Sequence, residues 1–286
     1  MRRNFAQILK EAKIDAEAEY RKLYGLLYDC SSPVSYDESV SLYEELSDCF
    51  LGFYFRGTCL SIEEFNDLHG FHFEKEPRPF HIDHLVLICE YIENMLKGYQ
   101  RARIAPTYEY MSMLQPEINV QFYSTQIDKV IEKIGYMPLY QDGFTIYVEK
   151  SPAAISVAES EQIPEDVSYK IISYNHHSMK GNLEEKKNTI LKLAELLEAK
   201  RKPLAQIDRA FCDDIFYLFN NLNLRHNNVD ASIKNNFRKA VADMPEEELE
   251  HWYDETYQMC LLAFLRLEQA DRKKEFDQLK SRINAT

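Results

Sequence analysis

Apolar residues recur at helical spacing along most of this chain, and short polar connections separate the repeats. Positions three and four residues apart share one face of an α-helix, so this spacing predicts amphipathic helices whose apolar faces lie in a core. Leu85, Ile88 and Ile92 are a clear example. The pattern predicts helices over residues 4–29, 36–55, 61–68, 82–99, 125–134, 167–178, 183–200 and 208–224, with further helices from about residue 245.

The segment at about 117–150 has a different pattern. Apolar and polar residues alternate over 118–122, which is typical of a strand. Further along, Asp142 and Gly143 separate two β-prone runs, and an Asp-Gly pair in this setting predicts a hairpin. With the helix expected between the first strand and the hairpin, the segment reads as a small β-α-β-β element. It is too small to be stable alone and should pack on neighbouring helices.

The length and the helical pattern together indicate two domains. A chain of 286 residues exceeds a single small core, and a polar stretch at 159–165 marks a boundary. Eight glycines and ten prolines are few for this length, which favours long helices over turn-rich β-folds. The predicted fold is therefore mainly α. An N-terminal helical domain (1–164) carries the β-α-β-β element, and a C-terminal four-helix bundle follows (165–286).

Charge is distributed unevenly along the chain. The net charge is −13, which repels a nucleic-acid backbone at long range. Residues 1–164 hold 15 Lys and Arg against 26 Asp and Glu, whereas residues 165–286 hold 19 against 21. Contact with a polyanion is therefore expected in the second half of the chain rather than the first.

The expected location is the cytoplasm. The N-terminal segment has recurring charges instead of the apolar stretch of a signal peptide. No window reaches 18 apolar residues, so no membrane span is expected. The six cysteines are scattered without a Cys-x-x-Cys pair, which indicates reduced thiols in cores.

A cluster of polar side chains follows the helix predicted over 208–224. It contains Asn221, Arg225, His226 and Asn228. An arginine can neutralise a phosphate, and a histidine that titrates near neutrality can act as acid or base, so these residue types suit phosphodiester chemistry. The alternative is a helix C-terminus, where asparagine tolerates the left-handed conformation and cations complement the helix dipole.

The order of these features resembles the HEPN superfamily, whose four-helix domains carry an Asn- and Arg-centred signature at the end of the third helix. Members often place a polar residue and then, a few residues later, a histidine after the arginine. Arg225 matches the arginine and His226 the polar position, but Val229–Ser232 stand where the downstream histidine belongs. The resemblance covers residues 165–270 only.

The resemblance implies a function as well as a fold. Many HEPN domains are metal-independent ribonucleases of bacterial toxin or phage-defence systems that form homodimers with a shared cleft. On this reading Arg225 would stabilise a phosphate of RNA, His226 would transfer protons, and Asn221 and Asn228 would orient the substrate.

Two adjacent histidines, His176 and His177, lie at the predicted end of the first helix of the bundle, just before Gly181. In an antiparallel bundle the ends of the first and third helices share a pole, so this pair would approach Arg225 and complete an acid–base set. The alternative is again a helix C-terminus, with Gly181 as the cap.

Four further histidines fall within sixteen residues as two His-x-x-His pairs, namely His69, His72, His81 and His84. Neutral imidazoles bind zinc, so four could fill a tetrahedral site, but the arrangement matches no known metal motif. Exposed loop histidines are the alternative.

Two classes of function follow from the sequence. The first is a HEPN-like RNA-acting protein, a metal-independent endoribonuclease that needs no cofactor. The second is a non-enzymatic helical adaptor or regulatory protein with a protein partner. Phosphate-binding loops, dinucleotide fingerprints and nucleophile elbows are absent from the sequence, which argues against nucleotide triphosphatases, dehydrogenases and α/β-hydrolases.

Overall fold

The computed structural model describes residues 14–29, 32–33, 39–104 and 118–285. The chain is mainly helical, as predicted, and it divides into two compact units, residues 1–147 and 148–286. This division precedes helix α7, whereas the sequence places the boundary at 164/165. None of the described helices is both long enough and apolar enough to cross a lipid bilayer.

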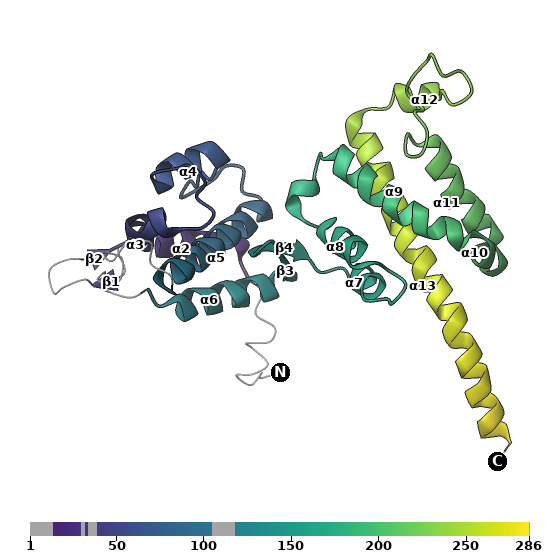
Figure 1. Ribbon diagram of the computed structural model, residues 1–286, viewed down its shortest axis with the longest axis horizontal. Helices are drawn as coiled ribbons and strands as arrows, with labels where there is room; N and C mark the ends of the chain where they lie inside the picture. The colour runs from purple at the N-terminus through teal and green to yellow at the C-terminus, as the bar shows by residue number, and fades with distance from the viewer. Residues whose placement is uncertain (1–13, 30–31, 34–38, 105–117, 286) are drawn as a thin grey trace, which may run out of the picture. The chain divides into compact units, whose positions relative to one another are not determined.

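The N-terminal unit is built around one long helix, α5, against which α2, α3 and α6 pack (Figure 1). Its elements are α2 (Ala16–Tyr28), β1 (Ser32–Pro33), β2 (Ser39–Val40), α3 (Leu42–Cys49), the 3-10 helix η1 (Phe50–Gly52), α4 (Ile62–His69), α5 (Ile82–Ile104), α6 (Val120–Lys133), β3 (Tyr136–Gln141) and β4 (Phe144–Glu149). Of the helix expected over 4–29, the part before residue 14 lies outside the described residues. Leu85, Ile88 and Ile92 are buried, as their spacing predicts.

Short-range signals place the ends of several helices. Ser61 accepts the backbone N–H of Glu64 at 3.2 Å, but the Glu64 carboxylate accepts the N–H of Leu60 instead of returning to Ser61. A complete capping box, in which side chain and backbone of the two residues bond reciprocally, forms at Ser41 and Glu44.

The predicted hairpin is present, but the strand expected before it is not. β3 and β4 pair across Asp142 and Gly143, whose φ angles of 51° and 88° suit this pair of residues. Residues 120–122 instead open helix α6, because Asn119 accepts the N–H of Phe122 at 3.1 Å and caps the helix. The β-α-β-β expectation was therefore wrong in its first strand.

Side chains of α5 satisfy the backbone of β4. Asn94 donates to the carbonyl of Thr145 and accepts its N–H, both at 2.8 Å. Glu90 accepts the N–H of Tyr147 at 2.7 Å. The hairpin thus packs on a helix before it, as its small size requires.

The C-terminal unit is a helical bundle around α13, which contacts α7, α9, α10 and α11. Its elements are α7 (Pro152–Ala158), α8 (Glu165–Ser173), the 3-10 helix η3 (His177–Met179), α9 (Leu183–Ala199), α10 (Arg201–Ile207), α11 (Arg209–Asn221), α12 (Lys239–Ala242) and α13 (Glu246–Asn284). Short α7 and α10 join the four longer helices in one core.

The described cysteines agree with the expectation of reduced thiols. Cys49, Cys59, Cys89, Cys212 and Cys260 are free and buried. Burial raises the pKa of the Cys49 thiol to about 11, with Asp48 adding to the shift, which favours the protonated thiol over the nucleophilic thiolate. Cys30 lies outside the described residues.

Candidate functional site

The side chain of Arg225 forms contacts within the C-terminal unit. Its guanidinium lies 2.6 Å from the Glu198 carboxylate and donates to the carbonyl of Ala194 at 3.0 Å. It also lies over the rings of Phe216 and Phe219, at 5.5 and 5.1 Å from the ring centroids. The side chain is 24% exposed. These contacts tie the segment after α11 to the last two turns of α9.

The two asparagines expected to orient a substrate are parts of the same connection. Asn228 is fully buried, and its amide bonds to the backbone of Asn220, Asn223 and Asn236. Asn221 donates to the carbonyl of Tyr217 at 2.9 Å and accepts from the Arg238 guanidinium at 2.8 Å. Both side chains therefore hold backbone and neighbouring side chains in place.

Asn223 adopts the left-handed conformation with φ of 53° directly after the helix, which is the role that the C-terminal cap alternative assigns to an asparagine here. His226 is exposed at the surface of the connection. The polar cluster at the end of α11 therefore has the geometry of a helix C-terminus followed by a loop that side-chain hydrogen bonds hold in place.

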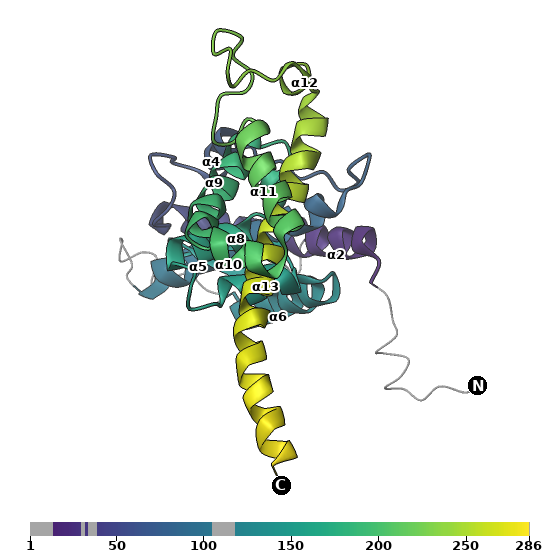
Figure 2. The same ribbon diagram turned by 90° about the vertical axis from the view of Figure 1, so that its right-hand side faces the viewer.

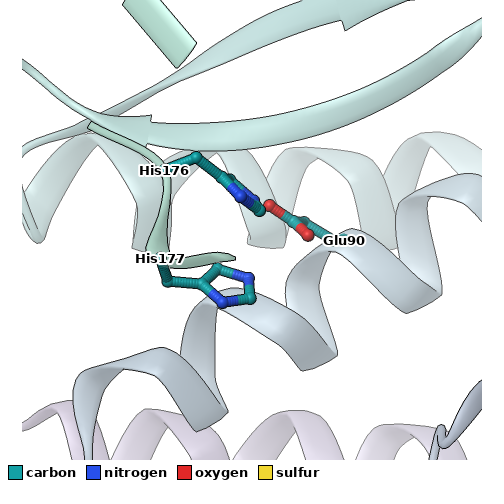
Figure 3. A group of neighbouring side chains, drawn as sticks. All are labelled: Glu90, His176 and His177. Carbon is teal, nitrogen blue, oxygen red and sulfur yellow. The ribbon is translucent and has the colours of Figure 1, made fainter. Parts of the chain in front are cut away.

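His176 and His177 lie side by side on the turn after α8, with ring centroids 4.1 Å apart (Figure 3). The backbone N–H of Ser178 donates to Nδ1 of His176 at 3.2 Å, so His176 caps the 3-10 helix η3. Gly181 follows with φ of 72° and donates its N–H to Glu250 at 2.7 Å.

The structure does not bring this histidine pair to Arg225. The pair precedes the first turn of α9, which begins at Leu183, whereas Arg225 contacts Ala194 and Glu198 near its end. At about 1.5 Å per residue, the rise from Leu183 to Ala194 is roughly 16 Å. The expected common pole assumes that α9 and α11 are consecutive helices, but α10 stands between them in the chain and packs on both.

Of the four histidines of the N-terminal unit, His72, His81 and His84 line one pocket, and His69 lies apart from it. The ring of His69 packs on Phe65 at 4.5 Å, and His72 lies 3.9 Å from Asp67. Nδ1 of His84 accepts the backbone N–H of His81 at 3.0 Å. In the described part of the chain, these four histidines do not gather into a metal-binding group.

Sequence reasoning missed a buried ionic cluster beneath the η3 turn. Lys186 is 5% exposed, and its Nζ lies 2.7 Å from both Glu250 and Asp254. The hydroxyl of Tyr174 donates to Asp254 at 2.8 Å. Glu250 belongs to a run of acidic residues that indicates a solvated helix start. Its ion pair with Lys186 could not be predicted because the two residues lie far apart in the sequence.

A basic pocket in the acidic N-terminal half of the chain was also not predicted from the sequence. Lys97, Arg101 and Arg103 lie around the last turns of α5 and line a pocket of about 930 Å³ with Asn119 and Gly143. The signal that could have found it is three cations within seven residues at the end of α5, of which Arg101 and Arg103 lie beyond the helix predicted over 82–99.

Comparison with known protein families, with curated proteins and with solved structures found no match for this chain.

Replacing Arg225 with alanine should lower the unfolding free energy of the C-terminal unit by about 1–3 kcal/mol, because a charged hydrogen bond and the ring contacts are lost. Arg225→Lys should fall in between, since lysine can keep only the contact with Glu198. Urea unfolding followed by fluorescence of Trp252, the single tryptophan, measures this. Unchanged stability in Arg225→Ala would show that the guanidinium is not a structural tie.

Proposed function

We propose that this chain is a non-enzymatic helical adaptor that assembles with a second copy of itself through the C-terminal part of α13. The supporting observation is that α13 continues beyond the core of its own unit (Figure 2). Its last buried residue among those described is Leu267, and the helix runs on to Asn284. At about 1.5 Å per residue, that extension is roughly 25 Å long.

The extension carries an exposed apolar stripe. Phe276, Leu279 and Ile283, which are 55%, 47% and 64% exposed, stand three and four residues apart. This is the spacing of the a and d positions of a coiled coil. Leu262 and Leu265 continue the same register towards the bundle, with polar residues at the two positions between. A groove of about 940 Å³ lies on this side of the helix, lined by Gln206 and Ile207 of α10 and by α13 residues from Arg266 to Leu279. The stripe thus has the geometry of an unfilled helix–helix interface.

Charges beside the stripe favour a parallel pair of identical helices. In this register Glu268 and Glu275 occupy g positions, and Lys273 and Lys280 occupy e positions. A parallel pair places each g residue against the e residue five positions later in the other copy, so Glu268 meets Lys273 and Glu275 meets Lys280. An antiparallel pair would set Lys273 against Lys280. The charge pattern therefore fits a second copy in parallel orientation.

The contacts of Arg225 bear on the competing proposal, a HEPN-like ribonuclease. For a phosphate to reach the guanidinium, the contacts with Glu198 and the carbonyl of Ala194 would have to break. Breaking the ion pair of Arg225 with Glu198 costs free energy, and of the histidines expected to transfer protons, His176 and His177 lie at the other end of α9. These contacts support the adaptor over the nuclease.

Replacing both Phe276 and Leu279 with aspartate should abolish self-association, because two carboxylates would then have to be buried in the seam. We expect wild-type protein to show a concentration-dependent mass approaching twice 33.7 kDa by light scattering after size exclusion. Gln278→Asp, on the outer side of the same helix turn, is the control and should associate like wild type. A wild-type mass that stays at 33.7 kDa over the whole concentration range would refute the proposal.

Charge exchange tests the parallel register in the same assay. Glu275→Lys and Lys280→Glu should each weaken self-association about two- to tenfold, because each change puts like charges opposite one another. An equimolar mixture of the two variants should associate like wild type, since both pairs become opposite in sign again. Single variants that associate as well as wild type would exclude this register.

A further inference from the structure

The basic pocket of the N-terminal unit is built from three elements. The last turns of α5 contribute Lys97, Arg101 and Arg103, the start of α6 contributes Asn119, and the hairpin turn contributes Gly143. This gathering of cations lies in the half of the chain that holds 26 acidic residues against 15 basic ones. The expectation that a polyanion would contact the second half of the chain rather than the first did not take this pocket into account.

Aromatic and hydroxyl groups surround the cations. Lys97 contacts Oγ1 of Thr145 and lies 5.1 Å from the ring centroid of Tyr140. Arg101 lies over the ring of Tyr54 at 4.1 Å. Within the described residues, neither Lys97 nor Arg101 forms an ion pair with a carboxylate. No described carboxylate therefore competes with an anionic ligand for these two charges.

The hairpin turn holds Arg101 at the pocket. Gly143 has φ of 88°, and a Cβ added there would lie 3.2 Å from Nη2 of Arg101 and 3.5 Å from the hydroxyl of Tyr54. That hydroxyl donates to the carbonyl of Gly143 at 3.2 Å. The absence of a side chain at this residue leaves room for the guanidinium between the turn and the ring.

The pocket also favours an anion electrostatically. Burial lowers the pKa of Lys97, and the nearby Arg101 lowers it further, while Glu93 acts in the opposite direction. An anion beside Lys97 and Arg101 would offset both effects, because it stabilises the protonated amine.

We propose that this pocket binds a nucleoside phosphate, with its phosphate on Lys97 and Arg101 and its base on neighbouring aromatic surface. Arginine and lysine are the usual phosphate ligands, and aromatic rings beside them stack bases regardless of sequence. Tyr140, whose side chain is 68% exposed, offers such surface. The volume of the pocket is in the range of small-molecule sites.

The nucleoside phosphate has two sources, a free nucleotide or a nucleotide of a single-stranded RNA. Calorimetric titration of the full-length protein with AMP and with an octamer of single-stranded RNA separates them. An octamer that binds at least tenfold more tightly than AMP identifies RNA as the source, because several phosphates and bases then contribute. Equal affinities identify the free nucleotide.

Variants of similar length test the site. Lys97→Met and Arg101→Met should each weaken binding of AMP at least tenfold, whereas Lys129→Met, on the exposed side of α6, should not change it. Arg101→Lys keeps the charge and should keep most of the affinity, which separates loss of charge from loss of structure. Thermal unfolding of each variant checks the fold.

Three outcomes would overturn the inference. They are no binding of AMP or of the octamer, affinities that the Met substitutions leave unchanged, and adenosine that binds as well as AMP. Because the pocket and the α13 stripe share no residue, the Phe276→Asp/Leu279→Asp variant should bind AMP like wild type. The test of AMP binding is therefore independent of whether the chain self-associates through α13.

Discussion

Replacing Lys186 with alanine should lower the unfolding free energy of the C-terminal unit by about 3 kcal/mol. Removing one partner of a buried ion pair leaves the other charge uncompensated, which costs about 3–5 kcal/mol. The lower end applies because the side chains of Glu250 and Asp254 are 22% and 44% exposed, so water can reach both carboxylates. Lys186→Met should lose a similar amount, since it keeps the packing but not the charge. Urea unfolding followed by Trp252 fluorescence gives the value.

Lys192→Ala on the same helix is the matched control. Lys192 pairs with Glu195 at 3.4 Å, but the two side chains are 48% and 67% exposed. Such surface pairs contribute less than about 1 kcal/mol, so this variant should unfold almost like wild type. Equal losses in the two lysine variants would mean that burial of the Lys186 cluster does not determine its contribution.

The same cluster predicts how stability depends on pH. Burial acts to raise the pKa of the Glu250 carboxyl, but hydrogen bonds from Lys186 and from the N–H of Gly181 outweigh it, and the pKa is lowered overall. A group whose pKa is lower in the folded state stabilises the fold above its unfolded pKa, which is about 4.3 for glutamate, and that contribution is lost as pH falls through the folded pKa.

Wild type should therefore lose more stability than Lys186→Ala as pH is lowered below about 4.3. Urea unfolding of both proteins at a series of pH values measures the difference. It should be largest near neutral pH and should shrink in acid. A difference that is independent of pH would show that protonation of these carboxylates is not coupled to the Lys186 contact.

Asn228→Ala should open the connection between α11 and α12 and destabilise the C-terminal unit by about 3 kcal/mol. The substitution leaves the N–H of Asn223 and the carbonyls of Asn220 and Asn236 without their partner. Each unsatisfied buried polar group costs about 1–3 kcal/mol. Asn228→Asp should be at least as damaging, because its carboxylate would face two carbonyl oxygens.

Hydrogen exchange measures the opening directly, since amides of residues 222–238 should exchange faster in the variant while those of α9 keep their protection. Asn227→Ala, at the exposed neighbouring position, should leave the exchange rates unchanged. If the amides of residues 222–238 stay protected from exchange in Asn228→Ala, the connection between α11 and α12 does not depend on the Asn228 side chain.

Elements specified by neighbouring residues were predicted well from the sequence. The hairpin turn depends on the ability of Asp142 and Gly143 to adopt positive φ, which is a property of those two residues. The amphipathic spacing of α5 likewise identifies its buried face. The strand expected over 118–122 failed because alternation across so few residues is also compatible with the first turn of a capped helix.

The candidate site depended instead on contacts between residues far apart in the chain. The polar segment after α11 has the composition of a catalytic cluster and of a helix terminus alike. Only the approach of Glu198 to Arg225 and of Asn236 to Asn228 distinguishes them, and neither partner is adjacent in sequence. The ionic cluster of Lys186 and the pocket at the end of α5 also depend on helix packing rather than on local pattern.

The hydrogen bonds from α5 to β4 limit the addition of a further strand to the hairpin. A two-stranded ribbon ordinarily leaves unpaired backbone groups on each outer edge, where a strand of another chain can add. Here the amide of Asn94 bonds to the N–H and carbonyl of Thr145, and the carboxylate of Glu90 accepts the N–H of Tyr147. A strand could therefore add to this edge of β4 only after these three hydrogen bonds with α5 had broken.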